Sequence, residues 1–422
     1  MQYISTRTGA KPVGASDAIM QGLAPDGGLY IPQSFPSVAH LPYGEISSYA
    51  ELAFEVLAPF FEGDPLMPEL AEICGEAFNF PVPLYPLQPE QMVLELFWGP
   101  TAAFKDFGAR FLAASMERIL RRRSERLTIL VATSGDTGGA VAAAFAGKEG
   151  ITVKVLFPKG RVSARQQQQL TCWGGNIEAY EVDGSFDDCQ KMVKQAFMDQ
   201  GLSMAYNLSS ANSINLGRLL PQSVYYVYAS RIFEGAFAKK PTIIIPSGNV
   251  GNATAAYWAC TMGAPIQRIA LAVNENRTIV DYLESGVYRG RSSVQTLANA
   301  MDVGDPSNME RLLALYPTVE EMRKAVAAWS VDDEAIRRTI REVWQESGYI
   351  LCPHTATAER VRRDHFADTP SIIVSTAHPA KFEETVEPLI GSSVEVPPQL
   401  GELLDKRSEY RSIAADYRLL FR

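Results

Sequence analysis

A regular alternation of apolar runs and helical patterns, which begins at residue 127, constrains the fold more than any other feature of this chain. Short runs rich in Val, Ile and Leu are typical of strands buried in parallel sheets, and parallel strands need helical crossover connections. The sequence predicts strands at residues 127–133, 152–157, 177–182, 204–207, 242–245, 269–273 and 371–375. The chain is therefore expected to be an α/β protein built from two parallel-rich α/β units.

The first 95 residues lack this rhythm and carry many prolines, strand-like pieces and a helical stretch over 49–61. The predicted segments are an N-terminal domain (1–95), a part of the large domain (96–125), a small α/β domain (126–210), the main part of the large α/β domain (211–385) and a C-terminal tail (386–422). The tail is expected to contain a charged helix over 403–421. Ligands of such folds bind at the carboxyl ends of the strands, between the two units.

Two of the predicted strands run into glycine-containing loops that open helices. The first loop is Thr133-Ser134-Gly135-Asp136-Thr137-Gly138, and the second is Ser247-Gly248-Asn249-Val250-Gly251-Asn252. A helix N-terminus offers free backbone N–H groups to an anion, and glycines let the backbone approach a phosphate closely. The second loop has neither the Lys-Ser/Thr pair of a Walker A motif nor G-x-G-x-x-G spacing. Either loop alone would also suit an ordinary βα turn.

Lys105 lies between Phe104 and Phe107, after a Gly-Pro turn and at the start of a helical pattern. Burial beside aromatic rings disfavours the ammonium ion, lowers the pKa of a lysine and makes its amine a usable nucleophile or base. The alternative is a surface lysine whose alkyl chain lies on apolar neighbours. Because two strand–glycine–helix junctions accompany this lysine, we expect a small phosphorylated aldehyde, pyridoxal 5'-phosphate. Lys105 would hold it as a Schiff base, and one loop would bind its phosphate.

Eight segments spread over most of the chain carry a resemblance to a known family. They are residues 3–7, 22–32, 99–107, 133–138, 186–189, 212–215, 246–252 and 375–382. With them the chain resembles the threonine synthases, which are fold type II (β-family) enzymes that use pyridoxal phosphate. It departs from the family pattern at Trp98, Leu216, Val250 and Cys352, where His or Asn, Trp, Phe and Asp are usual. None of these changes removes a group expected to act in catalysis.

The resemblance implies roles for the residues of these motifs. Lys105 would hold the cofactor and shuttle protons at the substrate Cα and Cβ. Thr376 would hydrogen-bond the pyridine nitrogen, and Asp136 would lie on the O3′ side of the cofactor. The cofactor phosphate would be bound by Gly248, Asn249, Val250, Gly251 and Asn252. The substrate carboxylate would be bound by Thr133, Ser134, Gly135 and Thr137.

The reaction of this family converts O-phospho-L-homoserine and water to L-threonine and phosphate by β,γ-replacement. The leaving phosphate needs cations or N–H donors, and Lys159, Arg161 and Ser163 follow the second strand of the small domain. They are candidates for that role, with a merely solvated loop as the alternative. His354 and His378 are expected to be structural histidines rather than groups of the site.

Composition agrees with an enzyme that acts on a small molecule. The net charge is 39 − 48 = −9, which argues against nucleic-acid or anionic-membrane surfaces as partners. Five scattered cysteines and four histidines lack metal-ligand spacing, which favours reduced thiols and no metal. No signal-peptide pattern and no apolar run near 18 residues is present. We expect a cytoplasmic protein that is a monomer or a homodimer.

Two other functions stay open at the level of sequence. A related pyridoxal phosphate lyase, such as a serine/threonine dehydratase or a phosphohomoserine γ-lyase, would release 2-oxobutyrate and ammonia instead of threonine. A non-catalytic paralogue that only binds the cofactor is the third possibility, and the presence of Lys105 and Thr376 argues against it.

Overall fold

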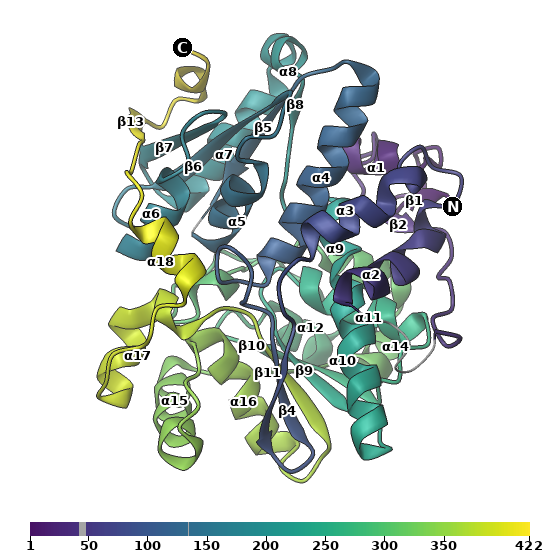
Figure 1. The fold of residues 1–422 in the computed structure, drawn as a ribbon, viewed down its shortest axis with the longest axis vertical. Coiled ribbons are helices and arrows are strands. Elements are labelled where there is room, and N and C mark those ends of the chain that lie inside the picture. The colour runs from purple at the N-terminus through teal and green to yellow at the C-terminus, as the bar shows by residue number, and fades with distance from the viewer. Residues whose placement is uncertain (42–47, 134) are drawn as a thin grey trace.

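The computed structural model describes residues 1–41, 48–133 and 135–422. In these residues the strands form one six-stranded, one five-stranded and one two-stranded sheet. The five-stranded sheet lies in the upper half of the molecule and the six-stranded sheet in the lower half, each flanked by helices (Figure 1). The predicted α/β architecture is confirmed.

The five-stranded sheet has the order β13-β7-β6-β5-β8, and each neighbouring pair in it is parallel. Its strands are β5 (Leu127–Ala132), β6 (Ile151–Pro158), β7 (Ile177–Asp183), β8 (Leu208–Ser209) and β13 (Arg411–Ala414). The helices along it are α5 (Asp136–Phe145), α6 (Ala164–Thr171), α7 (Phe186–Met198) and α8 (Gln200–Tyr206). The predictions for β5, β6 and β7 agree with the structure to within one residue at each end.

The predicted strand at 204–207 is wrong, because these residues lie at the end of helix α8. The side chain of Asp199 caps the start of this helix by accepting a hydrogen bond from the Leu202 N–H, and Asn207 ends it in a left-handed conformation. Met204 is among the exposed hydrophobic residues, so an apolar side chain here did not signal a buried strand. The strand that pairs with β5 on this side is β8, which begins at Leu208, one residue after the end of the predicted strand.

The six-stranded sheet has the order β11-β10-β9-β12-β4-β3, and only the edge pair β3–β4 is antiparallel. Its strands are β3 (Leu84–Gln88), β4 (Gln91–Glu95), β9 (Thr242–Pro246), β10 (Arg268–Val273), β11 (Ala327–Ser330) and β12 (Ser371–Ser375). The main helices along it are α10 (Gln222–Phe237), α11 (Gly251–Thr261), α12 (Thr278–Ser285), α15 (Asp333–Ser347) and α16 (Pro353–His365). β3 and β4 thus join this sheet although they precede residue 96, and the predicted domain boundaries stay a prediction.

The N-terminal part packs small elements against α4 (Lys105–Arg123), the long helix that starts at the lysine motif. Its strands β1 (Tyr3–Ser5) and β2 (Tyr30–Pro32) form the two-stranded sheet. Its helices are α1 (Ala15–Gln21), α2 (Tyr49–Leu57) and α3 (Leu70–Ala77), and the 3₁₀ helix η1 (Ala58–Phe61) continues α2. The helical stretch predicted over 49–61 is therefore a helix with a tighter last turn. Buried residues of these elements and of α4 share one hydrophobic core.

The predicted charged helix over 403–421 is also wrong. The tail contains α17 (Glu383–Ile390), α18 (Pro398–Leu404), β13 and the 3₁₀ helix η5 (Tyr417–Phe421). β13 adds to the edge of the upper sheet, where the Ser412 hydroxyl also donates to Glu181 Oε2 at 2.8 Å, 231 residues away in sequence. The hydrogen bonds that make this segment a strand come from a distant strand edge, so local residue preference did not reveal it.

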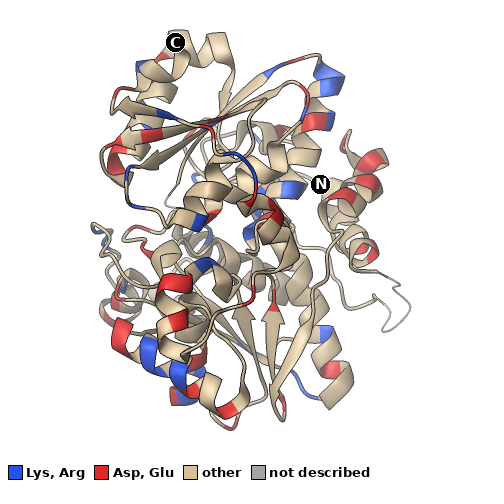
Figure 2. Cartoon of the chain, turned by 60° about the vertical axis from the view of Figure 1, so that its left-hand side comes forward, with Lys and Arg blue, Asp and Glu red and all other residues tan. Residues whose placement is uncertain are grey.

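Acidic and basic residues both lie largely on the outer helices of the molecule (Figure 2). In the part of the chain that the structure describes, we find no helix with the length and apolar character needed to span a bilayer.

Candidate active site

The start of α4 lies directly beside the segment that follows β12. The Phe104 N–H donates to the Thr376 carbonyl at 2.9 Å, and the His378 N–H donates to the Ala102 carbonyl at 3.0 Å. Ala103 and Ala377 form an isolated antiparallel bridge between these hydrogen bonds. The structure therefore brings Lys105 next to Thr376, although they are far apart in the sequence.

Lys105 is half-buried at the first turn of α4, and its Nζ lies 5.9 Å from the centre of the Phe104 ring. Burial lowers the pKa of Lys105 to about 8, and the charges of Arg218 and Lys381 act in the same direction, whereas Asp136 opposes the shift. Phe107, the other flanking aromatic, is fully buried in the core and packs against Phe80. The lowered pKa favours a reactive amine over the surface-lysine alternative.

Asp136 starts helix α5 just past the end of β5 and forms an ion pair with Lys381. The Lys381 Nζ lies 2.9 Å from Asp136 Oδ1, and both side chains are almost completely buried. Burial alone would raise the pKa of Asp136, but Lys381 and Lys105 hold it well below its usual range. Asp136 is thus a buried carboxylate whose charge acts on Lys105.

The loop before α5 is held in shape by Thr133. Its hydroxyl accepts hydrogen bonds from the N–H groups of Gly135 and Gly138, each at 2.9 Å. Gly135 has a φ of +142°, and a Cβ on it would lie 2.6 Å from the Gln166 amide. Thr137 is partly exposed at the first turn of α5. Ser134 lies outside the described residues, and its predicted role stays a prediction.

The second glycine loop connects β9 to α11 and presents the N-terminus of that helix. Val250 precedes α11 with a φ of +62°, which is costly for a β-branched residue. A Cβ on Gly248 would lie 2.7 Å from Met301 Cα, so glycine is required there by packing against the chain itself. The Asn249 amide donates to Ser213 Oγ at 2.6 Å, which ties the loop to the segment before α9 (Leu216–Leu219).

Some polar groups in this region lack a hydrogen-bond partner among the described residues, and Asn252 and Thr376 are the ones expected to meet the cofactor. Asn252 Oδ1 accepts hydrogen bonds from Tyr225 and Tyr226, each at 2.6 Å, while its buried Nδ2 donates to nothing. Thr376 is buried, and its hydroxyl has no hydrogen bond to any described residue. Buried polar groups usually find partners, so the Asn252 amide suits contact with a bound polar ligand, and the Thr376 hydroxyl is free to join it.

His354 lies within the electrostatic field of Asp136 and the two lysines, and its expected structural role stays a prediction. Its Nε2 accepts a hydrogen bond from the Ala300 N–H at 3.1 Å. Burial lowers the pKa of His354 to about 4, against the opposing pull of Asp136. Burial likewise lowers the pKa of His378 to about 4, and its Nδ1 accepts from the Ala380 N–H. Both imidazoles are neutral at pH 7.

Three family models match this chain nearly end to end. "Threonine synthase N terminus" matches residues 2–78, "Pyridoxal-phosphate dependent enzyme" matches 93–368, and "Threonine synthase, C-terminal" matches 355–420. The chain is 38% identical to the threonine synthase of Escherichia coli, over 100% of this chain and 98% of that one. It is 39% identical to that of Haemophilus influenzae, over 93% and 91% of the two chains.

This chain belongs to the threonine synthase family. The crystal structure of threonine synthase with bound pyridoxal phosphate from Brucella melitensis superposes with a TM-score of 0.93 at 36% identity, covering 100% of this chain and 98% of that one. The chain is accordingly a pyridoxal-phosphate-dependent enzyme of fold type II. Its own residues fit that cofactor, since a lysine of lowered pKa, a tight glycine loop and the buried Asn252 amide nitrogen without a partner occur together.

The residues predicted to bind the substrate phosphate are Lys159, Arg161 and Ser163, and they follow β6. Lys159 and Arg161 are exposed in the loop after β6. The Ser163 hydroxyl caps α6 by accepting from the Gln166 N–H at 3.2 Å. None of the three forms a hydrogen bond or ion pair with Lys105, Asp136 or Lys381, and their role stays a prediction.

Sequence reasoning missed several residues that surround Lys105. Lys381 lies within the matching segment 375–382, but its spacing gave no sign that it pairs with Asp136. Arg218 is a buried cation whose Nη1 donates to the Ala211 carbonyl at 2.6 Å and whose charge acts on Lys105. For Lys381 the available signal was a basic residue inside a segment that matches the family. For Arg218 it was a basic residue between apolar neighbours, Leu216 and Leu219.

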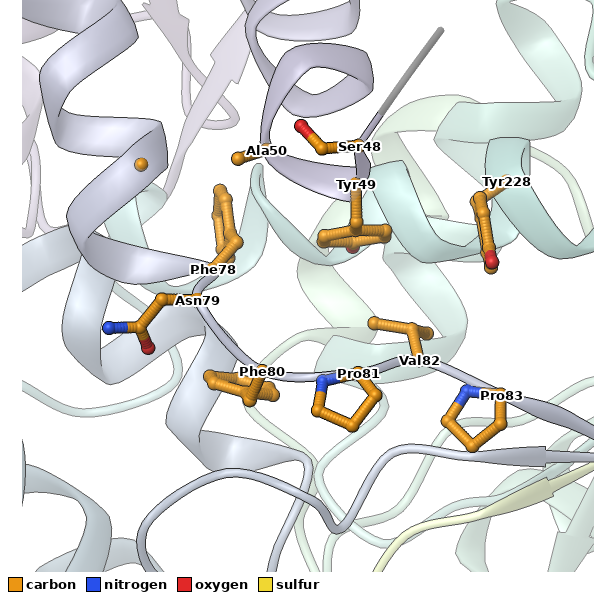
Figure 3. A pocket seen from close by; sticks show the side chains of 11 residues that line it. Ser48, Tyr49, Ala50, Phe78, Asn79, Phe80, Pro81, Val82, Pro83 and Tyr228 are labelled. Carbon is orange, nitrogen blue, oxygen red and sulfur yellow. The ribbon is translucent and has the colours of Figure 1, made fainter. Parts of the chain in front are cut away.

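A separate groove of about 620 Å³ lies between α2, the segment 78–83 and α10. Tyr49 and Tyr228 lie on one side of the groove, opposite Pro81 and Val82 of the segment 78–83 (Figure 3). None of its lining residues belongs to the site described above. It lies on the aromatic cluster that buries Phe107, since Tyr49 and Phe78 both pack against that ring.

Proposed function

We propose that this protein converts O-phospho-L-homoserine and water to L-threonine and phosphate. The observation that carries the proposal is the half-buried Lys105, whose lowered pKa and position beside Thr376 suit a residue that carries an aldehyde cofactor. In this reaction a proton leaves Cβ, the bond from Cγ to the phosphate oxygen breaks and phosphate leaves, Cγ gains a proton to become the methyl group, and water supplies the hydroxyl at Cβ. Bound pyridoxal phosphate supplies the electron withdrawal that acidifies the hydrogens at Cα and then at Cβ.

The residues around Lys105 have separable tasks in this proposal. Lys105 binds the aldehyde carbon and moves protons at Cα and Cβ, because its amine is available near neutral pH. Thr376 donates or accepts a hydrogen bond at the pyridine nitrogen through its unpartnered hydroxyl. The residues that bind the cofactor phosphate are Gly248, Asn249, Val250, Gly251 and Asn252. Asp136 holds negative charge on the O3′ side.

The substrate is oriented by the start of α5 and by the loop after β6. Thr133, Ser134, Gly135 and Thr137 bind the substrate carboxylate at the positive end of the α5 dipole, where the Gly135 N–H would exchange its hydrogen bond to the Thr133 hydroxyl for one to the carboxylate. Lys159 and Arg161 supply cations for the phosphate that leaves, and their exposed side chains have no ion pair among the described residues. Ser163 joins them at the start of α6.

We also infer that the protein works in the cytoplasm. All five cysteines are free, and four of them are buried. Reduced thiols in this number are typical of a reducing compartment.

The proposal is tested by the products and by the site of cofactor attachment. The protein loaded with pyridoxal phosphate is expected to release threonine and phosphate from O-phosphohomoserine in equal amounts. Borohydride reduction is expected to add the cofactor mass to the peptide that contains Lys105, and Lys105→Ala is expected to abolish turnover. Release of 2-oxobutyrate and ammonia, or a label on a different lysine, would contradict the proposal.

A further inference from the structure

A second lysine lies beside Lys105 and takes no part in the steps above. Lys381 belongs to the 3₁₀ helix η4 (Pro379–Phe382), and only 1% of it is exposed. Its ammonium lies 2.9 Å from Asp136 Oδ1 and donates to the Thr101 carbonyl at 2.8 Å. A lysine is rarely buried to this extent unless its charge is paired, and here a carboxylate and a carbonyl surround it.

Helix α6 brings second donors to the same two oxygens. Gln166 Nε2 lies 3.4 Å from Asp136 Oδ1, and Gln169 Nε2 donates to the Thr101 carbonyl at 3.2 Å. These glutamines lie one turn apart on α6, so they face the same side of that helix. Each of these residues is at least 95% buried.

This network joins the two halves of the molecule at the site. Lys381 and Thr101 flank the end of β12 and the start of α4, whereas Asp136, Gln166 and Gln169 follow β5 and β6 of the upper sheet. A hydrogen bond from Arg165 to the Ala380 carbonyl and an ion pair of Arg165 with Glu383 add to the same junction.

Lys105 lies within the field of these charges. Asp136, Arg218 and Lys381 all act on Lys105, and the neutral His354 faces the same group. Asp106, which is buried next to Lys105 in the chain, accepts from the Thr101 N–H and hydroxyl and also lies within reach of the Lys381 charge. If the Lys381 charge were absent, Asp136 would remain as a carboxylate without a counter-ion and would attract the proton of Lys105 more strongly.

We infer that Lys381 is a positioning residue for the reaction, whose ammonium fixes Asp136 and the Thr101 carbonyl across the two halves of the site and offsets the Asp136 charge at Lys105. This inference rests on the proposed role of Lys105 as the residue that binds the cofactor. Lys381 itself touches neither cofactor nor substrate in this assignment.

The informative variant is Lys381→Gln, because an amide keeps a donor for the buried oxygens and removes only the charge. Lys381→Met would instead remove the donor at 2.9 Å and leave Asp136 Oδ1 with the more distant Gln166 amide. Lys381→Arg keeps the charge, and Gln169→Leu removes the other donor to Thr101 without a change of charge. The full-length chain freed of cofactor is treated with an amine-reactive reagent at a series of pH values, and the peptide with Lys105 is quantified by mass spectrometry.

In the unchanged protein the reactivity of Lys105 is expected to rise with a midpoint near pH 8. Lys381→Gln is expected to move this midpoint upward by about one unit or more, whereas Lys381→Arg and Gln169→Leu leave it near 8. In the cofactor-loaded enzyme, Lys381→Gln is expected to lower kcat at least tenfold with the bound cofactor unchanged, and Lys381→Arg restores part of this loss.

An unchanged midpoint in Lys381→Gln would overturn the inference. An equal rise in Gln169→Leu would also overturn it, since solvent entry through a loosened junction would then explain the shift. If reduction places the cofactor on a different lysine, the proposed function of Lys105 fails. The titration of the cofactor-free chain still reports separately whether Lys381 controls the charge at Lys105.

Discussion

Lys105 and Lys381 bring the same side chain to one site, but their contacts suit them to different tasks. Lys381 is fixed by a carboxylate and a carbonyl, so its nitrogen is not available to a ligand. Lys105 has no ion pair among the described residues, and burial lowers its pKa to about 8. The amine that lacks a direct partner is the one suited to bind an aldehyde.

Thr376 provides the prediction that best tests the proposed contact at the ring nitrogen. Its hydroxyl has no partner among the described residues, while its carbonyl is held by the Phe104 N–H. Thr376→Val keeps the shape and removes the hydroxyl, so cofactor affinity is expected to fall by about 1–3 kcal/mol. Thr376→Ser is the matched control and is expected to keep most of the affinity. Equal cofactor affinity in the Val variant, measured by titration of the absorbance, would show that Thr376 only packs.

At the scale of elements, helix α6 holds the site together through its side chains. It starts at Ser163 in a capping box and presents Gln166 to the Gly135–Asp136 turn. The tail packs against its other end, where the Glu409 N–H donates to the Thr171 carbonyl at 2.8 Å and the Thr171 hydroxyl lies 2.6 Å from Ser408 Oγ. The C-terminal segment therefore supports a helix that contacts the site.

The contribution of the tail can be measured at Leu420. This side chain is fully buried in a small core with Leu130, Leu156 and Val182 of the upper sheet. Leu420→Ala removes apolar contacts and leaves a cavity, so the free energy of unfolding is expected to fall by about 2–5 kcal/mol. The half-buried Leu419 offers a control, and Leu419→Ala is expected to cost clearly less. Thermal and urea unfolding of both variants check this order, and equal losses would contradict the packing of η5.

At the scale of the whole molecule, the two sheets meet through polar groups that are buried from solvent. The free energy of unfolding of such a protein depends on pH, because each buried ionisable group prefers one charge state in the folded chain. His354 and His378 prefer the neutral state, since burial lowers the pKa of each to about 4. An unfolded chain binds protons at these histidines near pH 6.5, and the folded chain does not until about pH 4.

The protein is therefore expected to lose stability as the pH falls from 6.5 toward 4. Within that window the unfolded state binds more protons, so the free energy of unfolding rises with pH, by about 2 kcal/mol for His354 between pH 5 and 7. Urea unfolding at both pH values measures this slope. His354→Gln is expected to reduce it, and the exposed His40 offers a control in His40→Gln. An unchanged slope in the His354 variant would contradict the assigned neutral state.

Strands and motifs that are built from residues close together in the chain could be predicted from the sequence. Strands β5, β6, β7, β9, β10 and β12 follow from short apolar runs between glycines and helical patterns, and the fold class follows from their alternation. The motif around Lys105 and the loop over residues 247–252 were visible for the same reason, since glycines and helix starts have local signatures. The family resemblance gathered these pieces into one expected site.

Contacts between distant segments could not be predicted in this way, because they arise from the packing of the folded chain. Residues 411–414 are a strand because the edge of β7 supplies their hydrogen bonds, and residues 204–206 are helical although their apolar side chains suggested a strand. The ion pair of Lys381 with Asp136 needs both sheets in place, and the hydrogen bond of Lys381 to Thr101 joins residues 280 positions apart. A buried charge finds its partner through the packing of the whole chain, and no spacing in the sequence records that contact.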